Sequence, residues 1–231
     1  MKIWVMINNF IKRVFDFVSA LAALIVLSPV LLACAIWIKT DSKGPVIFRQ
    51  DRRTRHGRIF QMLKFRSMVN DAEKQGAGLF NFENDPRVTR SGRFLRKTSL
   101  DELPQLWNVL KGDMSIVGPR PCVSYELGDF DTLNARFKKR FEAVAGITGY
   151  AQVQGRNDLP WDEKADFDGK YIDLFRKWGC LIDIYIIGKT VIDVFRQKNI
   201  YENKQDDSLT DSEAARMAEE EIIRLAHEKK E

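Results

Sequence analysis

Two adjacent carboxylates, Asp101 and Glu102, lie where reactive side-chain types are densest along the chain. Pro104 follows them and precedes apolar residues at helical spacing. Proline fits a helix without loss only in the first turn, so this helix is expected to begin at Asp101 or later. Both carboxylates would then lie at the helix start, where the dipole favours anions and lowers the pKa of an acid. An ionised aspartate there can attack phosphorus, and a neighbouring glutamate can hold Mg²⁺ on phosphates.

The same residues have a purely structural interpretation. Ser99 and Glu102 match the S-x-x-E capping box, in which the glutamate only satisfies a backbone N–H at the start of a helix. Capping is the commoner use of such a pair. The residues alone leave both interpretations open.

Basic side chains on either side of this pair are candidates for neutralising phosphate charge. Residues 118–121 (GPRP) place one arginine between prolines, which suits aiming a guanidinium at a fork-shaped acceptor such as phosphate. A polyproline-like turn explains these four residues equally well. For the other cations, a solvated basic surface is the alternative. The candidates are Lys64, Arg66, Arg96 and Arg120.

An uncharged and largely apolar stretch covers residues 17–38 and is long enough to cross a bilayer. Ser28 and Pro29 lie in its middle, where proline is expected to break a helix and Ser28 could bond backbone groups freed there. Each half then covers about half of the hydrocarbon thickness. Basic residues flank both ends, which favours keeping both ends cytoplasmic. The stretch predicts a hairpin that dips into one leaflet; a spanning helix with a proline kink is the alternative.

The remaining residues predict a mostly helical α+β fold with a few short strands. A strand hairpin is expected at residues 44–50 and 58–65, and a long polar loop at residues 70–92. Helices are expected at residues 92–97, 102–111, 132–144, 161–178 and 181–196, and further strands at residues 115–117 and 150–154. The expected parts are a membrane hairpin (residues 1–40), a catalytic domain (residues 41–199) and a polar tail (residues 200–231) with a terminal helix.

Composition narrows the classes of partner. Three cysteines without metal-ligand spacing and only two histidines argue against disulfides and zinc. The net charge of +5 indicates an anionic partner, such as phospholipid head groups, nucleotide phosphates or nucleic acid. Aromatic residues fall within apolar patterns and not between basic residues, so nucleic acid is not expected as a partner.

The string DPRVTRSGRFLRKTSLDELPQLWNVLKGDMSIVGPRP, residues 85–121, resembles the core of the bacterial sugar transferase family, the monotopic polyprenyl-phosphate phosphoglycosyl transferases. The resemblance runs from Lys12 to about Thr190 and includes Ser28 and Pro29. It implies a re-entrant membrane helix, interfacial helices and a small catalytic domain on the cytoplasmic face of the bacterial inner membrane.

The resemblance also implies a reaction. Asp101 is expected to attack the sugar-linked phosphorus of a UDP-sugar, UMP leaves, and undecaprenyl phosphate then takes the phosphosugar. Glu102 is expected to bind the cofactor Mg²⁺. Membrane lipids are further expected partners, and a homodimer is left open. The residues expected to bind phosphate or substrate are Lys64, Arg66, Arg96, Arg120, Arg156 and Asp168.

Three positions depart from the family pattern. Ala145 stands where a proline is usual, Thr54 where a glycine is common, and Gly179 where a serine is frequent. These departures concern loop details and donor preference. Two alternatives to the expected reaction stay open at this point: a non-catalytic membrane adapter of glycan assembly, and single displacement with Asp101 only as a base or metal ligand.

Overall fold

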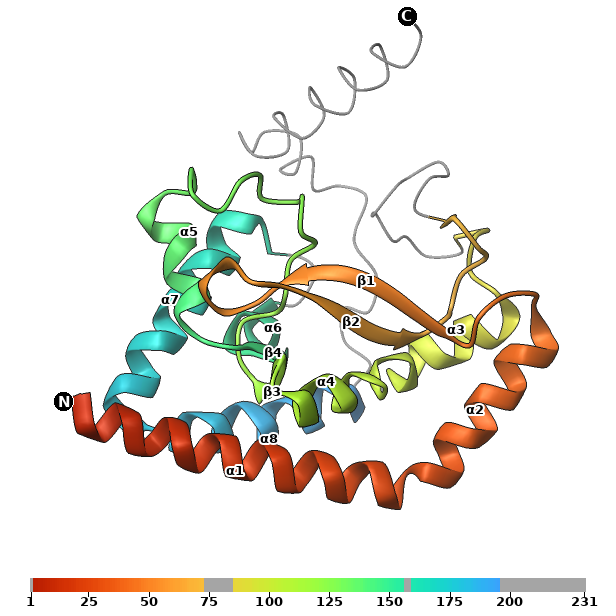
Figure 1. The fold of residues 1–231 in the computed structure, drawn as a ribbon, viewed down its shortest axis with the longest axis horizontal. Coiled ribbons are helices and arrows are strands. Elements are labelled where there is room, and N and C mark those ends of the chain that lie inside the picture. Colours follow the sequence, from red (N-terminus) through yellow and green to blue (C-terminus); the bar gives the residue numbers. More distant parts are fainter. Residues whose placement is uncertain (1, 73–84, 156–158, 196–231) are drawn as a thin grey trace, which may run out of the picture.

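The computed structural model describes residues 2–72, 85–155 and 159–195. The predicted mostly helical α+β arrangement is confirmed, with two small sheets among the described residues (Figure 1). Arg156 and the predicted tail at residues 200–231 lie outside this part of the chain. The first elements are helices α1 (Lys2–Val26) and α2 (Ser28–Asp41), strands β1 (Ile47–Arg53) and β2 (Ile59–Phe65), and helix α3 (Arg90–Lys97). A 3₁₀ turn η3 (Leu100–Glu102), helix α4 (Gln105–Lys111), strand β3 (Met114–Val117), helix α5 (Ala135–Lys139) and a 3₁₀ turn η4 (Arg140–Glu142) follow. Strand β4 (Ala145–Thr148) and helices α6 (Tyr150–Gly155), α7 (Trp161–Trp178) and α8 (Leu181–Phe195) complete the order.

The predicted break at Ser28 and Pro29 is confirmed. Helices α1 and α2 meet at Leu27 and are bent by 63°. Pro29 falls in the first turn of α2, where its missing N–H costs no helical hydrogen bond. The Ser28 hydroxyl donates to the carbonyl of Ile25 at 2.8 Å, so it satisfies an acceptor at the end of α1. Among the described residues, no single helix is long and apolar enough to cross a bilayer, although α1 and α2 taken together have the necessary length and composition.

Strands β1 and β2 form the predicted antiparallel hairpin, with Ile47 opposite Phe65 and Arg53 opposite Ile59. Strand β1 continues through residues 51–53, beyond the predicted end of the strand at residue 50. Their backbone pairs with β2, and one of their side chains is held by a neighbouring segment: Arg52 donates to the carbonyl of Pro121 at 2.9 Å. Polar residues therefore extend the strand because the protein supplies partners for them.

The region after β3 differs most from expectation. The predicted helix at residues 132–144 is reduced to α5 and the turn η4, because β4 begins at Ala145 and pairs in parallel with β3. A Cβ on Gly146 would lie 2.1 Å from the backbone nitrogen of Gly118, so this close pairing requires glycine. The strand predicted at residues 150–154 is wrong: these residues form helix α6, which packs against α7 and α8.

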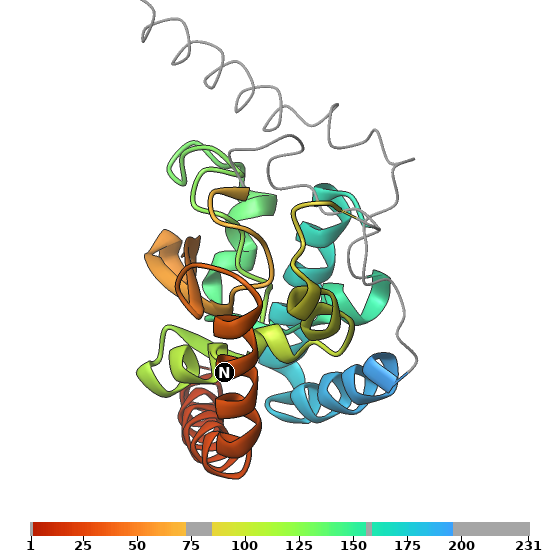
Figure 2. The same cartoon turned by 90° about the vertical axis from the view of Figure 1, so that its right-hand side faces the viewer.

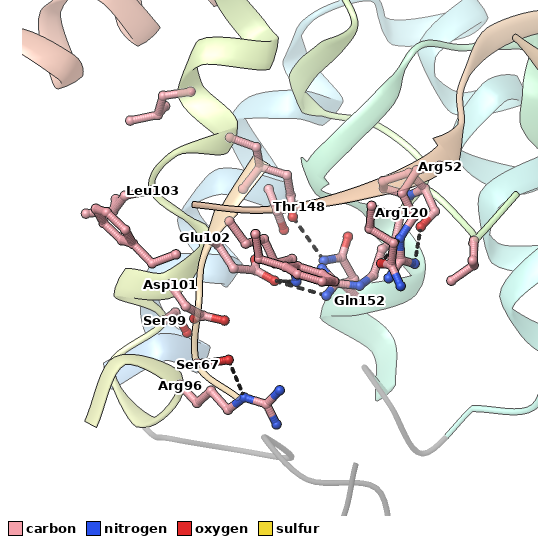
Figure 3. Close-up of a pocket in the computed structure, with 18 of the residues that line it drawn as sticks. Arg52, Ser67, Arg96, Ser99, Asp101, Glu102, Leu103, Arg120, Thr148 and Gln152 are labelled. Carbon is pink, nitrogen blue, oxygen red and sulfur yellow. Dashed lines mark hydrogen bonds and ion pairs between the residues drawn. The ribbon is translucent and has the colours of Figure 1, made fainter. Parts of the chain in front are cut away.

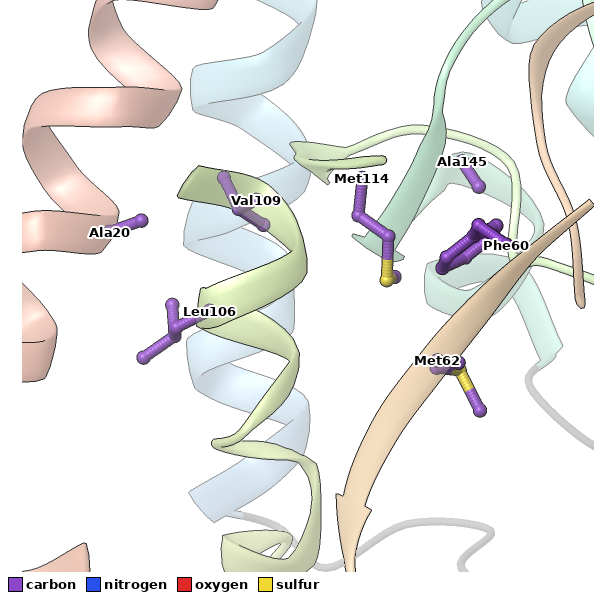
Figure 4. Packing of buried hydrophobic residues seen from close by; sticks show 7 residues of the cluster. All are labelled: Ala20, Phe60, Met62, Leu106, Val109, Met114 and Ala145. Atoms are coloured by element: carbon purple, nitrogen blue, oxygen red, sulfur yellow. The ribbon is translucent and has the colours of Figure 1, made fainter. Parts of the chain in front are cut away.

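Helix α1 shares a core with the domain that follows it. Ala20 of α1 belongs to one buried cluster with Phe60 and Met62 of β2 and with residues of α4, β3 and β4, and it lies on the side of α4 that carries Leu106 and Val109 (Figure 4). Asp16 accepts from the backbone N–H of Ile116 at 3.0 Å, and Arg13 donates to two carbonyls at the end of α4. Polar contacts and a shared core therefore attach α1 to the elements that carry Asp101.

Much of the apolar surface of α1 stays uncovered. Phe10 is 70% exposed and Val26 is 75% exposed, and on α8 Ile184 is 65% exposed. Figures 1 and 2 show α1 and α8 along the same side of the molecule. Uncovered apolar patches of this extent mark contact with lipid or protein.

The three departures from the family pattern have structural partners. The backbone N–H of Ala145 donates to the Thr54 hydroxyl at 3.0 Å, a bond that needs both departures because proline has no donor and glycine no acceptor side chain. Gly179 has a φ of 59°, and a Cβ there would lie 2.0 Å from Oδ1 of Asn8 in α1. These residues therefore determine local contacts away from Asp101.

Candidate active site

A cavity of about 870 Å³ is lined by both charged and apolar side chains. The predicted pair Asp101 and Glu102 lines it together with cations from β1, β2, α3 and the segment after β3. Apolar side chains of α1, α4, α8 and the short parallel sheet also line it. The charged lining includes Arg52, Lys64, Arg96, Asp101, Glu102 and Arg120. The apolar lining includes Ala23, Leu103, Leu106, Ile116, Ile147, Ile187, Val191 and Val194.

The turn η3 presents both carboxylates ahead of α4, which begins at Gln105 with Pro104 before it. The helix thus begins later than Asp101, as Pro104 indicated. The capping-box interpretation is wrong, since the Ser99 side chain makes no capping bond. Ser99 instead takes a left-handed backbone with a φ of 57°, which turns the chain from α3 into η3.

Glu102 forms ion pairs with two cations of the site. Its Oε1 accepts from Lys64 Nζ at 2.9 Å and from Arg120 Nη2 at 3.0 Å (Figure 3). Lys64 comes from β2 and Arg120 from the GPRP segment after β3, so the cluster unites three segments distant in sequence. Lys64 and Glu102 side chains are only 17% and 22% exposed, which strengthens these charge-assisted bonds.

The two neighbouring carboxyls have opposite pKa shifts. Burial raises the pKa of Asp101 to about 6, although Lys64 opposes the shift. Burial also opposes ionisation of Glu102, but the charges of Lys64 and Arg120 outweigh it and hold its pKa well below the ordinary value. The expectation of a lowered pKa is therefore wrong for Asp101, because loss of water exceeds the favourable charges around it. Asp101 is therefore the more basic of the two carboxyl groups.

Asn108 on α4 positions the pair relative to Lys64. Its side-chain amide accepts from the N–H of Leu63 at 2.9 Å and donates to the carbonyl of Gln61 at 2.8 Å. The amide thereby continues the hydrogen bonding of strand β2 and joins α4 to it. Asn108 was not predicted from the sequence, although a polar amide between the apolar residues Leu106 and Val109 was a signal for it.

The structure places the remaining predicted residues in different roles. Arg96 lines the cavity and donates through Nε to the Ser67 hydroxyl at 2.9 Å. Arg66 also borders the cavity. Its guanidinium donates to the carbonyls of Ile38, Ser42 and Lys43, and so connects the end of β2 to the end of α2. The expectation that Arg66 binds phosphate or substrate stays a prediction.

Asp168 of α7 also borders the cavity, but it is 1% exposed and pairs with Arg140 at 2.9 Å. Burial raises its pKa to about 6, although Arg140 opposes the shift. The charges of Arg140 and Lys164 both act on its carboxyl, and each of these cations also makes a cation–π contact with Trp161. Arg52, which the sequence analysis did not single out, lines the cavity and supports the GPRP segment through Pro121.

Among residues 2–72, 85–155 and 159–195, no group of three or more His, Cys, Asp or Glu side chains is arranged to hold a metal ion. Mg²⁺ in phosphate-transferring sites is commonly bound by one or two carboxylates, with substrate phosphates and water completing its shell. Asp101 and Glu102 are hard oxygen donors of this kind in the cavity lining, so the donor set fits Mg²⁺ held together with a phosphate.

Comparison with known proteins gives the class to which the fold and site belong. The sequence profile described as "Bacterial sugar transferase" matches residues 7–197, so this chain belongs to the bacterial sugar transferase family. The undecaprenyl-phosphate galactose phosphotransferase of Salmonella typhimurium is 42% identical over 210 residues, which cover 84% of this chain and 42% of that protein.

Two other relatives give the same result. The UDP-glucose:undecaprenyl-phosphate glucose-1-phosphate transferase of Xanthomonas campestris is 42% identical over 195 residues, covering 82% of this chain and 40% of the relative. The uncharacterized sugar transferase EpsL of Bacillus subtilis is 38% identical over 190 residues, covering 82% of this chain and 90% of EpsL. The chain spans about two fifths of the length of the Salmonella and Xanthomonas relatives.

Proposed function

We propose that this chain is a phosphoglycosyl transferase that moves a sugar-1-phosphate from a UDP-sugar to undecaprenyl phosphate. One observation carries the proposal: Glu102 is neutralised by Lys64 and Arg120, while the adjacent Asp101 is buried and has a raised pKa. A basic carboxylate beside fixed cations suits attack on a phosphate diester or anhydride. The names of the Salmonella and Xanthomonas relatives support the same donor and acceptor classes.

The reaction proceeds in two displacements at one phosphorus atom. A carboxylate oxygen of Asp101 attacks the sugar-linked phosphorus, the bond from that phosphorus to the bridging oxygen breaks, and UMP leaves with the electron pair. A phosphate oxygen of undecaprenyl phosphate then attacks the same phosphorus. The bond to Asp101 breaks, the carboxylate is regenerated, and the product is an undecaprenyl diphosphate sugar. Arg120 and Lys64 stabilise charge on the phosphate oxygens.

Magnesium is the proposed cofactor, with Glu102 as its ligand and Asp101 next to it. When bound, Mg²⁺ would neutralise charge on the donor phosphates. Lys64 and Arg120 both bind Oε1 of Glu102, so Oε2 would be the oxygen that holds the metal ion.

Apolar side chains in the cavity lining support a lipid acceptor. Ala23 of α1 and Val191 of α8 line the cavity, and both helices carry exposed apolar side chains. We infer that the bent pair α1–α2 enters one leaflet of the bacterial inner membrane and that α8 lies at its surface. The catalytic residues then face the cytoplasm, where UDP-sugars are available, and the acceptor phosphate can reach Asp101 without leaving the membrane.

The proposal is tested with the purified chain in lipid nanodiscs, a panel of UDP-sugars labelled with ³²P at the sugar-linked phosphate, and Mg²⁺. Release of UMP without acceptor, together with label bound covalently to the protein, is expected for the accepted sugar. Added undecaprenyl phosphate should discharge the label. UMP release that occurs only with acceptor, with no label on the protein, would favour single displacement. Absence of UMP release with every sugar and with acceptor would favour a non-catalytic adapter.

A further inference from the structure

The GPRP segment depends on other elements for its position. Its prolines have no backbone donors, and its three carbonyls at residues 119–121 are each bound from a different element. Gly146 of β4 donates to the carbonyl of Pro119 at 2.9 Å, and Arg52 of β1 donates to that of Pro121 at 2.9 Å. Between them, Nη2 of Arg140 donates to the carbonyl of Arg120 at 2.7 Å. The backbone of Arg120 is therefore held while its guanidinium binds Glu102.

Arg140 is itself held by Asp168. Their side chains are 2% and 1% exposed, with Nε to Oδ2 at 3.0 Å and Nη2 to Oδ2 at 2.9 Å. The Arg140 guanidinium also stacks on Trp161, 4.9 Å from the ring centroid. A buried ion pair is a weak source of stability because both charges lose water, but its geometry is narrowly defined. The Asp168 carboxylate and the Trp161 ring restrict the Arg140 guanidinium to one position, and from that position it can hold the carbonyl of Arg120.

We propose that Arg140, oriented by Asp168, is a positioning residue that fixes the Arg120 guanidinium on Glu102 for the transfer step. The inference rests on the proposed function. It assigns Asp168 a different part from the one that the family resemblance implied: Asp168 acts through Arg140 and Arg120, not by touching the substrate. Displacement of a catalytic group by about 1 Å can cost about a hundredfold in rate, so loss of this support is expected to slow the chemistry.

A nearby pair supplies matched controls. Arg136 precedes Arg140 by one helical turn and pairs with Asp166, two residues before Asp168 on α7. Both pairs join the same two segments, but Arg136 and Asp166 side chains are 44% and 58% exposed. Arg136→Met and Asp166→Asn therefore make the same chemical changes on the outer face, away from Arg120.

The experiment uses the full chain in nanodiscs with the UDP-sugar that the unaltered protein accepts. Covalently bound label counts active sites, and the rate constant of UMP release per active site is then measured over a range of donor concentrations. For Arg140→Met and Asp168→Asn, we expect a 10- to 100-fold lower rate constant at saturating donor, with the donor KM changed less than threefold. Arg140→Lys, which retains one donor and the charge, should recover part of the loss. Arg136→Met and Asp166→Asn should match the unaltered protein.

Each other outcome has a defined meaning. If the Arg140 and Asp168 variants keep the rate constant of their controls, the inference is overturned. A raised KM with an unchanged rate constant also overturns it, in favour of direct substrate contact by this pair. Should Arg140→Met fail to fold, Asp168→Asn and Arg140→Lys, which preserve shape, decide the question. If the unaltered protein releases no UMP, the proposed function fails instead, and that result is seen before any variant is compared.

Discussion

Arg136 and Arg140 lie one helical turn apart, and both form ion pairs with α7, yet they lie in opposite surroundings. The Arg136 pair is on the outer face, in water. The Arg140 pair is buried in the wall of the cavity and touches the backbone of Arg120. Water screens the first pair and leaves its geometry loose, whereas burial fixes the second. An ion pair between these two segments is therefore expected to influence the site only where it is buried next to the cavity.

Substitution of Asp101, in the cavity lining, should give the largest effect on the rate of reaction. Asp101→Asn removes the proposed nucleophile and keeps its size, so UMP release and covalent labelling should fall at least about a thousandfold. Rapid-quench measurement of ³²P-labelled protein checks this. Asp166→Asn on the outer face is the control and should label normally. Labelling of Asp101→Asn at the control rate would mean that another residue is the nucleophile.

Substitution of Lys64 tests the contribution of the cations that bind Glu102. Lys64→Met leaves Glu102 with Arg120 alone and removes a charge next to Asp101, so the rate constant of UMP release should fall about a hundredfold. The exposed Lys177→Met should have no effect on this rate. Equal rates for the two variants would show that Lys64 pairs with Glu102 but does not contribute to the transfer step.

Substitution of Asn108 tests whether the hydrogen bonds between α4 and β2 stabilise the fold around the site. Asn108→Leu leaves the backbone groups of Leu63 and Gln61 without partners, at about 1–3 kcal/mol each, so the Tm should fall. Differential scanning fluorimetry in nanodiscs measures the shift. Lys111→Gln, on the exposed part of the same helix, should melt like the unaltered protein. An unchanged Tm for Asn108→Leu would show that α4 does not depend on this link to β2.

Asp101 should also affect stability with a defined pH dependence. Its folded pKa of about 6 lies above the ordinary value of 3.8 because the carboxyl is buried. Folding therefore favours the protonated form, and stability from this group is present below about pH 4 and lost as pH rises through 6. With EDTA present, the Tm of Asp101→Asn should gain on that of the unaltered protein between pH 4 and 7. A constant Tm difference would contradict the raised pKa.

Substitution of the exposed Arg136 should give the smallest effect on stability and activity. Arg136→Ala breaks ion pairs with Asp162 and Asp166 that are largely in water, so neither Tm nor UMP release should change measurably. The same assays check it beside Arg140→Met. A loss of activity for Arg136→Ala alone would erase the distinction between inner and outer pairs.

Local residue chemistry was enough to predict several elements. Helix α7 was predicted at residues 161–178 and is found at Trp161–Trp178. The break at Ser28 and Pro29 was predicted because proline restricts the backbone around it, whatever lies nearby. Such features depend on few neighbours in the chain. The prediction that Asp101, Glu102, Lys64 and Arg120 share one site rested instead on the family resemblance, because these residues are distant in sequence.

From the sequence alone, most of the helices, the β1–β2 hairpin, the family and the charged groups of the site could be predicted, whereas β4 and α6 could not. The tertiary structure sets what each group contacts: Arg66 binds carbonyls at the end of α2, Asn108 continues the hydrogen bonding of β2, and Asp168 holds Arg140. It also reversed the expected pKa shift of Asp101, because burial depends on residues from the whole chain. Periodicity and spacing report which side chains share a face of one element, whereas desolvation and hydrogen-bond partners are set by elements that meet only on folding.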